Sequence, residues 1–487
     1  MADTSGVELM APVDRAWLEM DDPRNPMVIG ALFQLEGPVD AAVFQKAVVE
    51  RLLRYPRFRQ RVDVKHRTPH WVDEPDLDFH YHVQVHRLPV DNFDRALRKA
   101  VSAEMSRPLN HAKPLWRVLL YPRAGGPITV LFRAHHAIAD GMALVTLLID
   151  STDSGMLRAP ALPAVNGRKP HAGPLGDLID QLETFNAGLD RLQGLARNLR
   201  CSGRALQQVR DGRATLGAIR RVLRLPEDNP ASLGRELSGR RAVAWLHDQP
   251  LEPIRKRAAG LNVRVNDLFM AALAGALGRY IRRRERDMPE QQNLRVSIPV
   301  NLRNGRGREL GNRFGLILLD LPIGVTDPQQ RLALVVQRIG ALKESAEAKA
   351  TLWGLTAAGH LPVPFEKKLV SMISAKSVAV VSNLPGPKRH VRLAGARLKN
   401  LVFWPPQAGG MGVGISFFSY AGGLSVGLSA DRNVIPNPQT VLEFFQEEMA
   451  ALHALTQVEY GKEPAAPAPK PRRTSAPRRR AAAVAPA

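Results

Sequence analysis

The sequence lacks several features that would place it in particular protein classes. It has a single cysteine, Cys201, so no internal disulfide can form, which fits a reducing cytoplasm. No apolar run approaches the roughly 18 to 20 residues that a membrane span needs. The first residues, Met1-Ala-Asp-Thr-Ser5, lack the basic and then apolar pattern of a secretion signal. We therefore expect a cytoplasmic protein without a membrane span.

Acidic residues are scarce relative to basic ones, 46 against 68, which gives a formal net charge of +22. Between Arg197 and Arg241 eleven arginines stand against four acids, and from Pro464 to Ala487 there are six bases and no acid. Such runs suit an anionic membrane surface, phosphate-bearing substrates or nucleic acid, and a solvated basic surface is the plain alternative. Aromatic residues do not interleave with the basic runs, which disfavours nucleic acid.

The 487 residues are enough for two domains with their own cores. Strand-like and helix-like patterns alternate in two blocks, which predicts an α/β (α+β) fold, and a basic stretch with helical pattern separates the blocks. The predicted divisions are residues 1–152 for the first domain, 153–235 for a helical linker, 236–460 for the second domain and 461–487 for a disordered Pro/Ala/Arg tail.

The most informative stretch is His135-His136-Ala-Ile-Ala-Asp140-Gly141. A strand-like run over 128–134 precedes it, and an apolar helical run over 142–149 follows it. An imidazole with a pKa near 6.5 is neutral at pH 7 and can take the proton of an attacking alcohol, which contributes roughly 10² to 10⁴ in rate. The pattern favours acyl transfer with His136 as the base. A pair of core or loop histidines is the alternative interpretation.

The acid and the glycine that end this stretch have structural interpretations. Asp140 can pair with an arginine or the turn backbone, or it can cap the helix that starts at Gly141. We favour a structural Asp140 over a second catalytic acid. Gly141 is expected to take a backbone conformation closed to other residues.

Two other patterns suggest functional sites, an esterase nucleophile and a metal site, but their sequence context supports neither site well. Gly423-Leu-Ser425-Val-Gly427, with Asp431 and His453 after it, matches the nucleophile elbow of an esterase. The alternation of apolar and small residues predicts one continuous strand there instead of the required strand, turn and helix. His80, His82 and His86 have spacings that suggest metal ligands, but no cysteine or carboxylate cluster completes a site, so we assign no metal.

The histidine stretch resembles the motif of the CoA-dependent acyltransferase superfamily, which includes chloramphenicol and carnitine acyltransferases and peptide-synthetase condensation domains. Over about residues 10–457 the chain further resembles the bacterial wax ester synthase/diacylglycerol acyltransferase family, whose motifs occur in order. These are Asn25-Pro26-Met27, Pro114-Leu115-Trp116, Val265-Asn266-Asp267, Pro299-Val300-Asn301-Leu302-Arg303, Gly311-Asn312 and Ser382-Asn383-Leu384-Pro385-Gly386-Pro387. Leu268-Phe269-Met270 and the basic tail depart from the family pattern.

The resemblance implies two chloramphenicol-acetyltransferase-like domains joined by the linker, with an active-site tunnel at their interface. Acyl-CoA would enter from one side and a long-chain alcohol or a diacylglycerol from the other. His136 would be the base and His135 a supporting residue. The acyl-CoA would be a co-substrate, and no cofactor or metal is implied.

The resemblance also assigns residues to the substrates. Asn266 would position the substrate or contribute to the oxyanion site, and Ser382 and Asn383 are further candidates for substrate binding or positioning. Pro114-Leu115-Trp116 would shape the acyl pocket or pack beneath it. Arg303 is a candidate partner for Asp140. Three bases are candidates for the CoA phosphates or for a solvated surface, namely Lys376, Lys388 and Arg389.

Two alternatives remain open from the sequence: a free-standing condensation-type acyltransferase and a non-catalytic protein of lipid surfaces. The basic tail predicts peripheral contact with the inner face of an anionic membrane or with lipid bodies. The sequence does not determine the preferred acceptor, the acyl chain length or the oligomeric state.

Overall fold

The computed structural model describes residues 7–37, 40–65, 68–154, 233–234, 236–285, 287–301, 314–343 and 376–455. The predicted linker falls almost wholly outside these ranges, and the predicted tail, Arg303 and Gly311-Asn312 fall outside them entirely. Among the described helices, none is long and apolar enough to cross a membrane.

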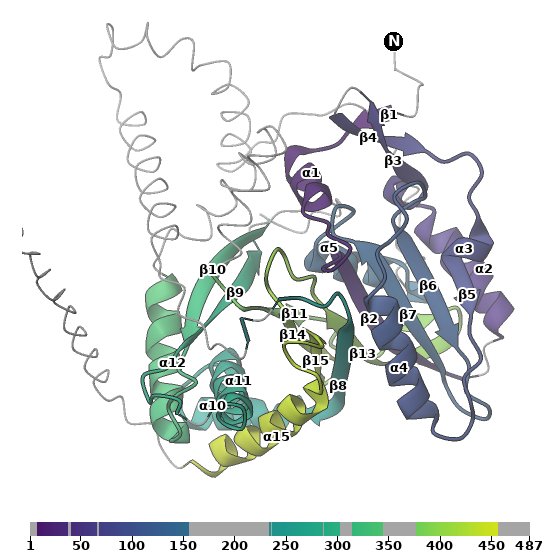
Figure 1. Cartoon of the computed structure of the whole chain (residues 1–487). Helices are drawn as coiled ribbons and strands as arrows, with labels where there is room; N and C mark the ends of the chain where they lie inside the picture. The colour runs from purple at the N-terminus through teal and green to yellow at the C-terminus, as the bar shows by residue number, and fades with distance from the viewer. Residues whose placement is uncertain are drawn as a thin grey trace, which may run out of the picture.

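Strands from the first half of the chain form a six-stranded sheet together with β12 and β13 from the second half, and they form a smaller three-stranded sheet by themselves (Figure 1). The large sheet has the order β12 (Arg392–Leu393), β13 (Ala396–Trp404), β2 (Val28–Glu36), β7 (Ile128–His135), β6 (Trp116–Tyr121) and β5 (Val83–Val85). The small sheet has the order β1 (Val7–Leu9), β4 (Thr68–Asp73) and β3 (Gln60–Lys65). The helices are α1 (Pro12–Glu19), α2 (Ala41–Leu52), α3 (Phe79–His82), α4 (Phe93–Met105) and α5 (Gly141–Asp150), with a 3-10 turn at Pro56–Phe58.

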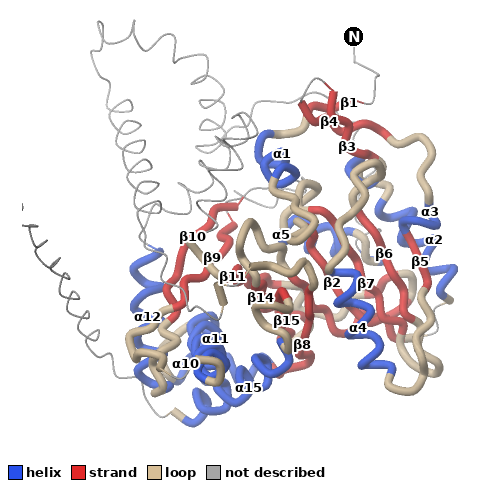
Figure 2. Tube along the Cα trace, viewed as in Figure 1, coloured by secondary structure: helices blue, strands red, loops and turns tan. Residues whose placement is uncertain are grey.

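The second half builds another six-stranded sheet with helices gathered beside it (Figure 2). Its order is β10 (Phe314–Leu321), β9 (Leu294–Asn301), β11 (Ala379–Pro385), β14 (Val413–Tyr420), β15 (Gly423–Asp431) and β8 (Arg241–Pro250). Its helices are α10 (Leu251–Gly260), α11 (Val265–Arg282), α12 (Pro328–Lys343) and α15 (Pro438–Ala454). The α/β class predicted from the sequence is therefore confirmed.

Strand β13 crosses between the halves. It pairs antiparallel with β2, so that Trp404 lies opposite Gly30, although it follows residue 236 in the chain (Figure 1). Its side chains alternate between two cores, because Phe403 packs with one face of the sheet and Trp404 with the other. The first sheet therefore depends on residues from the predicted second domain, which the division at residue 236 does not anticipate.

Polar contacts also join the halves. The amide Nδ2 of Asn25 donates to the carbonyl oxygens of Gly409 at 2.7 Å and Met411 at 3.2 Å, and its Oδ1 accepts from the buried Arg241. Near these contacts, the backbone N–H of Arg241 donates to Ser106 Oγ of the first half at 2.8 Å. Because Asn25 and Arg241 are buried and paired, the two halves are held in a fixed relation at this point.

Candidate active site

His135 is the last residue of β7 and is completely buried. Its backbone N–H donates to the carbonyl oxygen of Leu115 at 2.9 Å. Its ring nitrogen Nδ1 accepts from the backbone N–H of Ala137 at 3.1 Å. The ring therefore fixes the turn that follows the strand, which fits the supporting role implied for this residue.

His136 lies inside that turn and is 6% exposed. Its backbone N–H donates to the carbonyl oxygen of Met27 at 2.8 Å. Its imidazole stacks on the indole of Trp17 from helix α1, with ring centroids 4.3 Å apart and an interplanar angle of 25°. The backbone and the ring plane are thus both held, as a general base requires. Trp17 was not predicted, because no local pattern links it to a residue more than a hundred positions away.

Asp140 caps helix α5. Its side chain accepts from the backbone N–H of Ala143 at 2.9 Å, and it is 4% exposed. This confirms the predicted capping role. The proposed pairing with Arg303 cannot be placed, since Arg303 lies outside the described residues.

The expectation for Gly141 is wrong. It is the first residue of α5 and is absent from the glycines with positive φ. Its constraint is space, because a Cβ at this position would lie 2.8 Å from Cδ1 of Leu384. Leu384 belongs to β11 of the second sheet, so the end of the histidine motif packs against the other half of the molecule. The predicted location of the motif at a domain interface is confirmed by this contact.

Two residues implied by the resemblance meet beside this contact. Asn383, which precedes Leu384, donates from Nδ2 to Oδ1 of Asn266 at 3.0 Å. Asn266 lies in the first turn of α11, where the side chain of Asp267 accepts from the backbone N–H of Arg264 at 2.9 Å. Burial raises the pKa of Asp267. Asp267 thus serves the helix end, and Oδ1 of Asn266 is bound by Asn383. Ser382 is buried within β11.

Pro114-Leu115-Trp116 lies beneath the histidines and packs in the core. Trp116 is fully buried, donates from Nε1 to the carbonyl oxygen of Phe58 at 2.9 Å, and stacks on His82 with centroids 4.3 Å apart. Burial lowers the pKa of His82 to about 4, against a hydrogen bond to the Trp116 carbonyl that raises it. His82 is therefore a neutral core histidine. Among the described residues, His80, His82 and His86 do not come together in a group of possible metal ligands.

An apolar cavity begins at Gly141 and has an empty volume of about 830 Å³, its open mouth included. Side chains of β2, β7, β13, α2 and α5 line it, and Leu384 and Phe418 of the second sheet complete the wall. Arg51 and Ser151 are the polar residues among the lining side chains. Neither His136 nor any residue of Pro114-Leu115-Trp116 lines it, so the latter motif supports the fold and does not shape this pocket.

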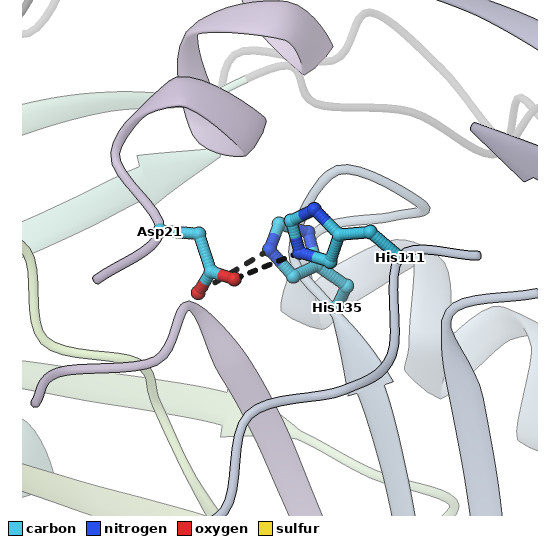
Figure 3. A group of neighbouring side chains, drawn as sticks. All are labelled: Asp21, His111 and His135. Carbon is cyan, nitrogen blue, oxygen red and sulfur yellow. Dashed lines mark hydrogen bonds and ion pairs between the residues drawn. The ribbon is translucent and has the colours of Figure 1, made fainter. Parts of the chain in front are cut away.

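Asp21 lies beside the histidine motif, and no sequence pattern had predicted it there (Figure 3). One carboxylate oxygen accepts from His111 Nε2 at 2.9 Å, and the other lies 3.6 Å from His135 Nε2. Within the described residues, Asp21, His111 and His135 form a group whose ligand atoms lie within 4.8 Å of one another, close enough to be tested as a metal site.

The esterase interpretation fails on geometry. Ser425 lies within the continuous strand β15, opposite Phe418 of β14, and is buried. Asp431 accepts from the backbone N–H groups of Ser238 and Gly239, at 3.1 and 3.0 Å. Ser425 is not presented at a turn, so the predicted strand is confirmed.

Comparison with known proteins decides the family. The profile of the wax ester synthase/diacylglycerol acyltransferase catalytic domain matches residues 10–269, and that of the family's C-terminal domain matches residues 310–453. The chain belongs to this family. It is an acyltransferase. The catalytic-domain profile continues through β8 and α10 into α11, so its end does not coincide with the boundary between the two halves described above.

Individual proteins and solved structures are also similar to this chain. The chain is 26% identical over 464 residues to a protein of Mycobacterium tuberculosis named as a probable diacylglycerol O-acyltransferase, covering 92% of this chain and 96% of that one. The fold is similar to that of a wax ester synthase/diacylglycerol acyltransferase from Marinobacter aquaeolei VT8, with a TM-score of 0.64, 21% identity and coverage of 91% and 98%. It is also similar to a starter condensation domain of rhizomide synthetase in complex with C8-CoA, with a TM-score of 0.58, 15% identity and coverage of 93% and 96%.

Proposed function

We propose that this acyltransferase moves a long-chain fatty acyl group from acyl-CoA to the hydroxyl of a diacylglycerol or a long-chain alcohol, with His136 as the general base. The observation that carries the proposal is the placement of His136. Its backbone is bound to Met27, its ring is stacked on Trp17, and the motif that contains it ends at an apolar cavity.

The chemistry follows from the nature of the two substrates. A thioester is already activated, so the alcohol can attack it directly without a covalent enzyme intermediate or a cofactor. The difficult step is removal of the hydroxyl proton as the oxygen attacks, and a neutral imidazole at the attacking oxygen can accept it. The same proton can then pass to the departing CoA thiolate. The negative oxygen of the tetrahedral intermediate needs a donor, and the amide of Asn266 is our candidate.

The cavity supports a long hydrocarbon chain as the ligand. Leu144, Leu147 and Leu148 line it from helix α5, whose ten residues extend over roughly 15 Å. An alkyl chain in this space would exchange water for apolar contacts, which favours binding at about 25 cal/mol per Å² of apolar surface buried. The chain would run from the motif at Gly141 toward Arg51 and Ser151. A tunnel that also admits the acceptor stays a prediction.

The test is to measure CoA release from palmitoyl-CoA in three mixtures, without acceptor, with hexadecanol and with a diacylglycerol. Direct transfer requires an acceptor for CoA release and gives no stoichiometric burst of CoA without one. A burst without acceptor would contradict direct transfer and indicate an acyl-enzyme. The side-by-side rates give the acceptor preference, for which the site offers no discriminating contact.

We further propose that the basic tail, residues 461–487, binds anionic lipid and brings the enzyme to the surface where its acceptors dissolve. Its excess of basic residues supports this, since each base near an anionic surface contributes about 1 kcal/mol at low salt. Removal of the tail should weaken flotation with anionic liposomes and reduce the salt sensitivity of binding. Equal flotation of the full chain and the truncated chain would contradict the proposal that the tail binds anionic lipid.

A further inference from the structure

The carboxylate of Asp21 lies between two imidazoles at the histidine motif (Figure 3). Its Oδ2 accepts from His111 Nε2 at 2.9 Å, and its Oδ1 accepts from the backbone N–H of Met27 at 2.7 Å. Its Oδ1 also faces Nε2 of the fully buried His135 at 3.6 Å. Asp21 follows helix α1, so these contacts connect the N-terminal segment to the end of β7.

The hydrogen bonding of His135 decides what this cluster can do. A metal bound at Nε2 would place the proton on Nδ1, where a ligating histidine normally donates to an oxygen. Here Nδ1 instead receives the backbone N–H of Ala137 at 3.1 Å. Two donors cannot share that contact, so Nδ1 carries the lone pair and Nε2 carries the proton. The Nε2–H group points at the Asp21 carboxylate, which opposes metal binding and favours a charge-assisted contact.

Asp21 is charged in this setting. Burial works against its ionised form, but hydrogen bonding to His111 and His135 outweighs burial, and the pKa of Asp21 lies well below its usual range. A permanent negative charge opposite His135 Nε2 keeps the proton on that nitrogen. This in turn keeps Nδ1 an acceptor for Ala137. His136 stands between His135 and Ala137, so the turn that carries the base is closed by this one ring.

We propose that Asp21 is a positioning residue for acyl transfer, which acts through the His135 ring to hold the turn that presents His136, with His111 as the second donor that keeps the carboxylate in place. The proposal rests on the function proposed above for His136. The separation of 3.6 Å at His135 is longer than a hydrogen bond, and such contacts often tighten only when substrate is bound.

The central test is the Asp21→Asn variant. The amide oxygen can take the place of Oδ1 opposite Met27 and His135, but the variant removes the negative charge that faces His135 Nε2. The amide nitrogen then takes the place of Oδ2 and, as a donor, cannot accept from His111 Nε2. Misplacement of a catalytic base lowers the reaction rate by up to about 10²-fold. We therefore expect kcat to fall by about 10- to 100-fold, while KM for acyl-CoA changes by less than about twofold. Asp22→Asn is the matched control, because Asp22 is the exposed neighbour whose carboxylate binds Arg24 and not the histidines. It should keep wild-type kcat.

A double-mutant cycle separates positioning through His135 from a general structural effect. If Asp21 acts through that ring, then Asp21→Asn should slow the His135→Ala variant by less than about twofold. A full additional loss in the His135→Ala background would overturn the proposal, as would wild-type kcat in folded Asp21→Asn. Tight Zn²⁺ binding by the wild type that Asp21→Asn abolishes would also overturn it, since the ligating Nε2 must then be unprotonated.

The same assay distinguishes failure of this inference from failure of the proposed function. Loss of activity in His136→Ala together with full activity in Asp21→Asn would overturn only the role of Asp21. Full activity in folded His136→Ala would overturn the base itself, and with it the reason for holding the turn.

Discussion

The two ends of the seven-residue motif are held in different ways. The histidine end depends on distant residues, namely Asp21, Met27 and Trp17, all from the N-terminal segment. The aspartate end depends on a local helix cap, Asp140 to Ala143, and on an apolar contact between Gly141 and Leu384 of the other half.

The two ends of the motif therefore have different tasks: the histidine end serves catalysis, and the aspartate end serves the stability of the fold. Long-range polar and aromatic contacts fix the orientation of the base, so their loss should appear mainly in kcat. The cap and the apolar contact hold the helix and the interface, so their loss should appear mainly in stability. Substitutions at the two ends should therefore give different kinds of defect.

The largest effect after the base itself is expected at Trp17, whose indole faces the His136 ring. Trp17→Leu keeps an apolar side chain but removes the aromatic face, and misplacement of the base should lower kcat by up to about 10²-fold. Trp17→Phe keeps an aromatic face and should stay within a few-fold of wild type. Steady-state kinetics of the two folded variants measure this, and equal kcat values would mean that stacking does not orient the base.

A smaller and different effect is expected at Asp140. Asp140→Ala removes the N-cap of α5 and should lower the free energy of unfolding by about 0.5–2 kcal/mol. Asp140→Asn keeps a side-chain acceptor at the cap and should be closer to wild type in stability and in kcat. Denaturant unfolding and kinetics on both variants test the assignment. A kcat in Asp140→Asn as low as that of a His136 variant would give Asp140 a chemical role.

Local features of the fold could be predicted from the sequence. The strand leading into His135 and the helix leading out of Asp140 were placed to within one or two residues, as β7 and α5. Asp140 was predicted as an N-cap, and its side chain accepts from Ala143 in the structure. These features depend on hydrophobic period and capping chemistry, which neighbouring residues carry.

Features that depend on distant parts of the chain could not be predicted. Asp21 and His135 are 114 positions apart in the sequence, and nothing near either residue indicates the other. The pairing of β13 with β2 is likewise determined by tertiary packing and not by local sequence. Gly141 was explained by backbone freedom, whereas its constraint is the side chain of Leu384.

The most direct test of the central claim is the turnover of folded His136→Ala with palmitoyl-CoA and the preferred acceptor. Removal of a general base predicts a loss of roughly 10² to 10⁴ in kcat, with the unfolding transition of the wild type preserved. Near-wild-type turnover in a variant that unfolds like the wild type would contradict the assignment of His136 as the base.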